Sequence, residues 1–140
     1  MSLLKEEELA NILPEDGPSV EETKKYLEKY NDEFIVIKCG GSVLVDPTLF
    51  KIFIEDVAVL NKLGFNPIII HGGGKRINNK LAKLNIKSNF INGLRVTDKN
   101  TINIVEDVLI EFNTEIVDAL KAQSCKTRRI TSKEYNIITV

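Results

Sequence analysis

Two glycine-rich turns, each directly after a short apolar run, are the residues of this chain best suited by type and spacing to do chemistry. The first turn follows residues 34–38 (FIVIK) and the second follows residues 67–71 (PIIIH). Because glycine has no Cβ, backbone N–H groups in such turns can approach a ligand closely. A helix start behind a turn adds the positive end of a dipole. The glycines are Gly40 and Gly41 in the first turn and Gly72, Gly73 and Gly74 in the second.

Lys38 ends the first apolar run and would point its ammonium group into the cradle that the two turns form. Positioned N–H donors and positive charge around a transferring group are what phosphoryl transfer requires. The second turn is not a Walker A loop, because Lys75 is followed by Arg76. Simpler interpretations stay open: the glycines can be structural turns, and Lys38 and His71 can be ordinary strand-end residues. Phosphate or carboxylate binding is the prediction that we carry forward.

Arg95 is a further candidate and lies in residues 92–97 (NGLRVT). The Asn-Gly pair predicts a hairpin turn, and a hairpin overhanging the sheet edge could aim Arg95 at a substrate. A guanidinium group matches a carboxylate in bidentate geometry. A solvated surface arginine is the alternative.

The elements that must position these residues alternate between strand and helix. Asp46 and Pro47 predict the start of one helix and Gly64 its end. A short helix follows the second turn, and a long one begins at Thr97 or Asp98 and continues to about residue 120. Residues 126–131 and 136–140 are predicted as two short strands. The order predicts an α/β fold with a mainly parallel open sheet, helices on both faces and three αβα layers.

A chain of 140 residues, with 43% hydrophobic and 28% charged residues, is long enough for one domain or one lobe of a two-lobed protein. A net charge of −1 gives no basic field that would favour nucleic acid. No apolar run approaches the ~20 residues of a membrane helix. Two distant cysteines and one histidine cannot form a multi-histidine metal centre. We therefore expect a cytoplasmic protein without a resident metal, nucleic-acid partner or membrane anchor.

Three motifs in order resemble the acetylglutamate kinases of the amino-acid kinase superfamily. They are residues 36–42 (VIKCGGS), residues 71–74 (HGGG) and residues 92–97 (NGLRVT), within a resemblance from about Tyr26 to about Leu120. The resemblance implies phosphorylation of the side-chain carboxylate of N-acetyl-L-glutamate by ATP with Mg²⁺, in arginine biosynthesis. No tightly bound cofactor is implied.

The resemblance also assigns roles to the candidate residues. Lys38 would stabilise the transferring phosphoryl group, flanked by Gly40 and Gly41. The second turn, Gly72 to Gly74, would hold the reacting carboxylate and phosphoryl oxygens. Arg95 would bind the α-carboxylate of the acceptor.

Members of that family are about twice as long, and their second half binds the nucleotide. The chain is therefore expected to be the acceptor-binding half, apparently truncated, with residues 1–31 as a helical extension and residues 32–140 as the lobe. It would act as a homo-oligomer, dimer or hexamer, with the helix near residues 98–122 at the subunit interface, or with a complementary C-terminal half. Alternatives are a non-catalytic N-acetylglutamate-binding or regulatory module, a related kinase for carrier-bound 2-aminoadipate, and a generic nucleotide-binding α/β domain.

Overall fold

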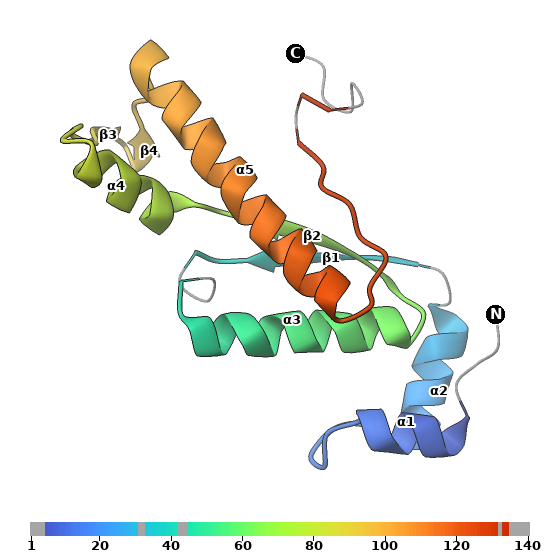
Figure 1. The fold of residues 1–140 in the computed structure, drawn as a ribbon. Coiled ribbons are helices and arrows are strands. Elements are labelled where there is room, and N and C mark those ends of the chain that lie inside the picture. Colours follow the sequence, from blue (N-terminus) through green and yellow to red (C-terminus); the bar gives the residue numbers. More distant parts are fainter. Residues whose placement is uncertain (1–4, 31–32, 42–44, 132, 135–140) are drawn as a thin grey trace.

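The computed structural model describes residues 5–30, 33–41, 45–131 and 133–134. Six helices and strands precede the hairpin, and one long helix follows it (Figure 1). In chain order the elements are α1 (Glu6–Ile12), α2 (Val20–Lys29), β1 (Phe34–Cys39), α3 (Pro47–Lys62), β2 (Asn66–His71), α4 (Gly74–Lys83), β3 (Phe90–Ile91), β4 (Leu94–Arg95) and α5 (Lys99–Ala122).

Strands β1 and β2 form a parallel pair whose register runs from Phe34 opposite Asn66 to Cys39 opposite His71. The α3 helix connects them. The glycine turns therefore begin at the same end of both strands, which is the carboxyl edge of the sheet. The predicted α/β class with a parallel sheet is confirmed.

The main core lies between this sheet and the helices α3 and α5. Both helices pack against the same face of the sheet, and Figure 1 shows α5 running obliquely across the strands. Phe112 of α5 is the largest of the fully buried side chains and is 1% exposed. The other buried members of this cluster are Cys39, Ile54, Val57, Ile116, Leu120 and Cys125.

The opposite face of the sheet is apolar and uncovered by the described residues. Phe34 is 70% exposed, Val36 60% and Ile70 53%. Side chains alternate between the two faces of a strand, which places these residues opposite the core. Parallel sheets are normally covered on both faces, which is why the continuous apolar runs predict three layers. The described residues supply two of them.

The helix boundaries follow the expected capping chemistry. The Asp46 carboxylate accepts hydrogen bonds from the backbone N–H groups of Thr48 (2.8 Å) and Leu49 (3.1 Å). Asp98 caps α5 in the same way, so of the two expected candidates it is the cap. Gly64 ends α3 with a φ of 100°, a conformation that suits glycine.

The two N-terminal helices contact each other, and each buries one leucine: Leu9 of α1 is 1% exposed and Leu27 of α2 is 4% exposed. Lys24 and Glu6 form an ion pair between them. Ser19 and Glu22 make the reciprocal hydrogen bonds of a capping box at the start of α2. The division of the chain at residue 31 stays a prediction.

The strand expected at residues 126–131 is wrong, because the structure has no strand there. This segment instead runs back beside α5, where Asn113 donates a hydrogen bond to the Ile130 carbonyl (3.4 Å). Arg129 forms an ion pair with Glu134 (2.8 Å). Strand formation needs a neighbouring strand, and the described residues place none alongside. The strand expected at residues 136–140 lies outside the described residues.

Candidate functional site

The two glycine turns lie side by side at the carboxyl edge of the sheet. Cys39 is paired with His71, so Gly40 and Gly72 each follow the last paired residue of its strand. Neighbouring strands are about 4.8 Å apart. The predicted cradle therefore has both of its turns in place, which is the position at which α/β sheets bind ligands.

Lys38 is opposite Ile70 in the register and is exposed. Because Cys39 faces the core, strand alternation directs Lys38 to the uncovered face. It makes no hydrogen bond or ion pair with any residue that the structure describes. Its ammonium group is thus available at the end of β1, beside the first glycine turn.

Gly73 packs the second turn directly against α5. A Cβ built on Gly73 would lie 2.7 Å from Cδ2 of Leu109, so a side chain at this position would require Leu109 to shift. Gly72 and Gly74 have nothing within 4 Å of such a Cβ, which leaves open space over their backbone. The Gly73 carbonyl accepts a hydrogen bond from Ile77 N–H (2.8 Å), the first of α4. The N–H groups of the first turn of the helix have no partner within it and can serve a ligand.

His71 faces the core at the base of this turn. Its ring meets the Phe112 ring edge-on, with 5.0 Å between centroids, and its buried Nδ1 atom has no hydrogen-bond partner among the residues that the structure describes. Burial lowers the pKa of His71, and the nearby positive charge of Arg76 lowers it further, while the Gly72 backbone opposes the shift. These causes favour a neutral imidazole.

Arg76 links α4 to α5 beside His71. Its guanidinium group forms an ion pair with Glu115 (2.7 Å) and lies over the Phe112 ring at 3.9 Å. Phe112 therefore contacts His71 and Arg76, which lie on either side of the second glycine turn in the sequence. In the sequence, Phe112 belongs to a set of apolar residues that recur every three or four positions along α5, but no sequence pattern links it to the second turn.

The lowered pKa of His71 predicts a pH-dependent stability. Below about pH 6.5, the ordinary histidine value, the unfolded chain binds a proton that the folded chain resists. The contribution of neutral His71 to the free energy of unfolding should therefore be fully present above that pH. It should be lost as the pH falls through the lowered pKa of the folded state. We expect His71→Gln, which cannot titrate, to reduce this slope in urea unfolding between pH 7 and 5. An unchanged slope would contradict the assignment; His71 is the single histidine of the chain, so its NMR titration gives an independent measurement.

Arg95 lies at the end of β4, where two side chains and one ring hold its guanidinium group. Its Nη1 atom donates to Ser88 Oγ (2.6 Å) and its Nη2 atom donates to Asn78 Oδ1 (2.5 Å). Its Cζ atom lies 4.7 Å from the centroid of the Phe90 ring. The hairpin predicted from the Asn-Gly pair is confirmed, as β3 and β4 are antiparallel.

Asn78 connects Arg95 to the second glycine turn. It lies four residues after Gly74 on α4, about 6 Å along the helix axis. Through Asn78, the guanidinium group of Arg95 is therefore held about one turn of α4 away from the second glycine turn. Sequence reasoning includes Asn78 among the residues that resemble the family but assigns it no role, and it misses Ser88, since a lone serine in a loop carries no recognisable pattern.

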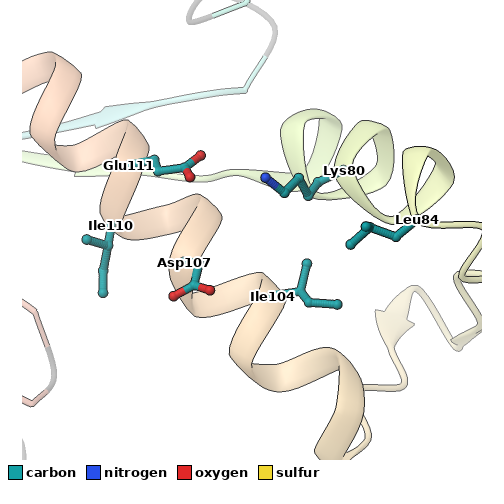
Figure 2. Close-up of a pocket in the computed structure, with 6 residues that line it drawn as sticks. All are labelled: Lys80, Leu84, Ile104, Asp107, Ile110 and Glu111. Carbon is teal, nitrogen blue, oxygen red and sulfur yellow. The ribbon is translucent and has the colours of Figure 1, made fainter.

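A hollow of about 350 Å³ lies further along α4 and α5, away from the glycine turns. Figure 2 shows Lys80 and Glu111 pointing toward one another from the two helices. It contains none of the predicted site residues. Its lining residues are Lys80, Leu84, Ile104, Asp107, Ile110 and Glu111.

The described residues provide neither a metal site nor a membrane-spanning helix. Within the described residues, no group of three or more His, Cys, Asp or Glu side chains could hold a metal ion. No helix in the same part of the chain is long and apolar enough to cross a membrane. Burial raises the pKa of the Cys39 and Cys125 thiols, which favours the protonated, unreactive form.

A parallel α/β sheet with two glycine turns at one edge and a lysine at the end of the first strand defines an amino-acid kinase-like lobe. Residues 33–140 match the amino acid kinase family, and the chain belongs to this family. It is 81% identical over 140 residues to an acetylglutamate kinase from Pelagibacter ubique (strain HTCC1062), covering 100% of this chain and 49% of that protein. It is 42% identical over 122 residues to an acetylglutamate kinase from Jannaschia sp. (strain CCS1), covering 86% of this chain and 43% of that protein.

These similarities confirm the resemblance to acetylglutamate kinases and extend it. The expected limit near Leu120 is wrong, because the family match continues to residue 140. The chain spans about half the length of the curated relatives that it matches.

A similar fold occurs in an N-acetylglutamate synthase from Neisseria gonorrhoeae, solved in complex with coenzyme A and N-acetyl-glutamate. The TM-score is 0.60 at 24% sequence identity, covering 74% of this chain and 24% of that one. At this identity the likeness supports the fold alone.

Proposed function

We propose that this chain is the acceptor-binding half of an acetylglutamate kinase. The observation that carries the proposal is the 81% identity of the whole chain to a protein of that name. The reaction is the ATP-dependent phosphorylation of the side-chain carboxylate of N-acetyl-L-glutamate, with Mg²⁺, in cytoplasmic arginine biosynthesis. The chain spans 49% of that relative, and we place the nucleotide site in the remaining half, as the resemblance to the family implies.

The proposed roles follow from charge and position. Arg95 binds the α-carboxylate of the acceptor, and the N–H groups of Gly73 and Gly74 orient the reacting carboxylate. Lys38 and the N–H groups of Gly40 and Gly41 stabilise negative charge on the phosphoryl group during transfer. The open space over Gly72 and Gly74 is consistent with close approach of ligand oxygens.

A calorimetric titration of the 140-residue chain with N-acetyl-L-glutamate tests the acceptor site. Arg95→Ala is expected to weaken binding by roughly 1.5–3 kcal/mol, the size of a hydrogen bond to a charged group. Lys38→Ala is the matched control, because a group acting on the transferring phosphoryl should leave acceptor affinity almost unchanged. Equal binding by the wild type and Arg95→Ala would remove Arg95 from the site.

N-acetyl-L-glutamine separates the two carboxylate sites in the same titration. It retains the α-carboxylate for Arg95 but presents a neutral amide to the second glycine turn. We expect it to bind more weakly than N-acetyl-L-glutamate and still to depend on Arg95. The same affinity for both ligands would favour a module that does not recognise the reacting carboxylate.

We also propose that the protein forms a homo-oligomer with α5 at the subunit interface. Apolar side chains remain exposed on these helices: Ile102 of α5 and Leu84, which lines the hollow, are each 48% exposed. Burial of such side chains favours association. Sedimentation equilibrium of Ile102→Asp against the wild type tests this arrangement, and an unchanged mass of an oligomer would contradict it.

A further inference from the structure

Arg95 differs from the arginines whose ion pairs the structure shows. Arg76 is paired with the carboxylate of Glu115, and Arg129 with that of Glu134. Arg95 is also fixed by hydrogen bonds, but both acceptors, Ser88 Oγ and Asn78 Oδ1, are neutral. Within the described parts of the chain, no carboxylate forms a salt bridge with it.

The three groups around Arg95 come from three separate segments. Asn78 belongs to α4, Ser88 to the loop before the hairpin, and Phe90 to β3. Ser88 Oγ also lies 3.5 Å from Asn78 Oδ1, which links the first two segments. A guanidinium group has five N–H donors, so two hydrogen bonds and a stacked ring fix its plane and leave donors for a ligand. Fixing the group in advance reduces the ordering cost of binding.

Neutral acceptors hold the guanidinium group without cancelling its charge. A carboxylate in the position of the Asn78 amide would form a charge-assisted pair with Arg95 and compete with an incoming anion. We propose that Asn78 and Ser88 are positioning residues that hold Arg95 for a ligand carboxylate while leaving its positive charge uncompensated. The proposal rests on the proposed function, because it concerns the carboxylate that Arg95 is proposed to bind.

The isosteric change Asn78→Asp distinguishes this role from simple structural support. It keeps the acceptor oxygen and the size of the side chain but adds a negative charge. Arg95 should be held at least as firmly, and the melting temperature should not fall. Affinity for N-acetyl-L-glutamate should nevertheless fall by at least about tenfold, because the charge of Arg95 is then satisfied internally.

Removing either acceptor should act differently. Asn78→Ala and Ser88→Ala each remove one neutral hydrogen bond, so we expect roughly fivefold weaker binding and a more mobile guanidinium group. Asn79→Ala is the matched control, because Asn79 is the exposed neighbour of Asn78 on α4. It should bind like the wild type.

Two measurements on the ¹⁵N-labelled 140-residue chain test whether Asn78 and Ser88 hold Arg95 without cancelling its charge. The NMR signal of Arg95 Nε–Hε, assigned by its loss in Arg95→Lys, reports whether the group is held. Calorimetry with N-acetyl-L-glutamate reports affinity. The expected pattern is a held group with normal affinity in the wild type, a held group with lost affinity in Asn78→Asp, and a mobile group in Asn78→Ala.

The outcomes separate this inference from the proposed function. If Asn78→Asp binds like the wild type, the charge argument is overturned while the acceptor site stands. If the wild type does not bind N-acetyl-L-glutamate, the proposed function of the isolated chain fails. Titration with acetate then still tests the inference. Acetate should shift the Arg95 Nε–Hε signal in the wild type and should leave it unchanged in Asn78→Asp. A mobile Arg95 in the wild type overturns it directly.

Discussion

Phe112→Ala is expected to lower the free energy of unfolding by about 3–5 kcal/mol, the usual cost of truncating a buried phenylalanine. Phe112 is 1% exposed in the main core. Its ring also meets His71 edge-on and lies under the guanidinium group of Arg76. The variant therefore loses apolar burial together with two ring contacts, and urea unfolding followed by circular dichroism measures the loss.

Phe34→Ala is the matched control for Phe112→Ala. It makes the same chemical change at a side chain that is 70% exposed on the uncovered face of the sheet. It should shift the free energy of unfolding by less than about 1 kcal/mol. Equal losses in the two variants would mean that the core is not centred on α5. Phe112→Ala should also raise the pKa of His71 toward its ordinary value, because water then reaches the ring.

Gly73→Ala is expected to lower the free energy of unfolding by about 1–2 kcal/mol, mainly through the loss of a favourable N-cap. A new Cβ would lie 2.7 Å from Leu109 Cδ2, the far end of a side chain that can shift, so the steric cost should fall at or below the low end of the usual range of about 1–3 kcal/mol. Gly73 is also the N-cap of α4, a position where glycine is clearly preferred to alanine. The strain falls on the turn proposed to bind the acceptor, so affinity for N-acetyl-L-glutamate should fall as well.

Gly74→Ala tests whether the effect of Gly73→Ala comes from the contact. Nothing lies within 4 Å of a Cβ at Gly74, and alanine suits the first position of a helix. This variant should be as stable as the wild type or slightly more so. In Gly73→Ala with Leu109→Ala, the steric part of the loss should be relieved, leaving the cost of truncating Leu109. If the double variant is destabilised by the full sum of the single changes, α5 does not constrain the turn.

Local chemistry explains why much of the fold could be predicted from the sequence. Asp46, Pro47 and Gly64 determine where α3 begins and ends through a cap, a fixed φ and a positive φ. The glycine turns could be predicted for the same reason, since each directly follows a run of strand-forming residues. The edge of the sheet where these turns meet then follows from the parallel order alone.

Contacts between distant segments explain what could not be predicted. Arg95 was a candidate from its local motif, but its partners Asn78 and Ser88 lie 17 and 7 residues away and become neighbours only when α4 packs beside the hairpin. The absence of a strand at residues 126–131 has a similar cause. The β-forming composition of that segment is suitable, but strand formation depends on a partner elsewhere in the chain.

Because α5 is the last described element in the chain order, it is synthesised after the strands that it covers. The buried residues of the core cluster begin with Cys39 and end with Phe112, Ile116, Leu120 and Cys125. At about 5–20 residues per second, the interval between the translation of these two ends is several seconds or more. During that time α5 does not yet cover the core-facing side of β1, so both faces of the strand are exposed. Its FIVI segment has the apolar, β-forming composition of an aggregation-prone strand. The chain should therefore depend most on chaperone protection while it is still attached to the ribosome, a demand that slower translation before residue 120 would increase.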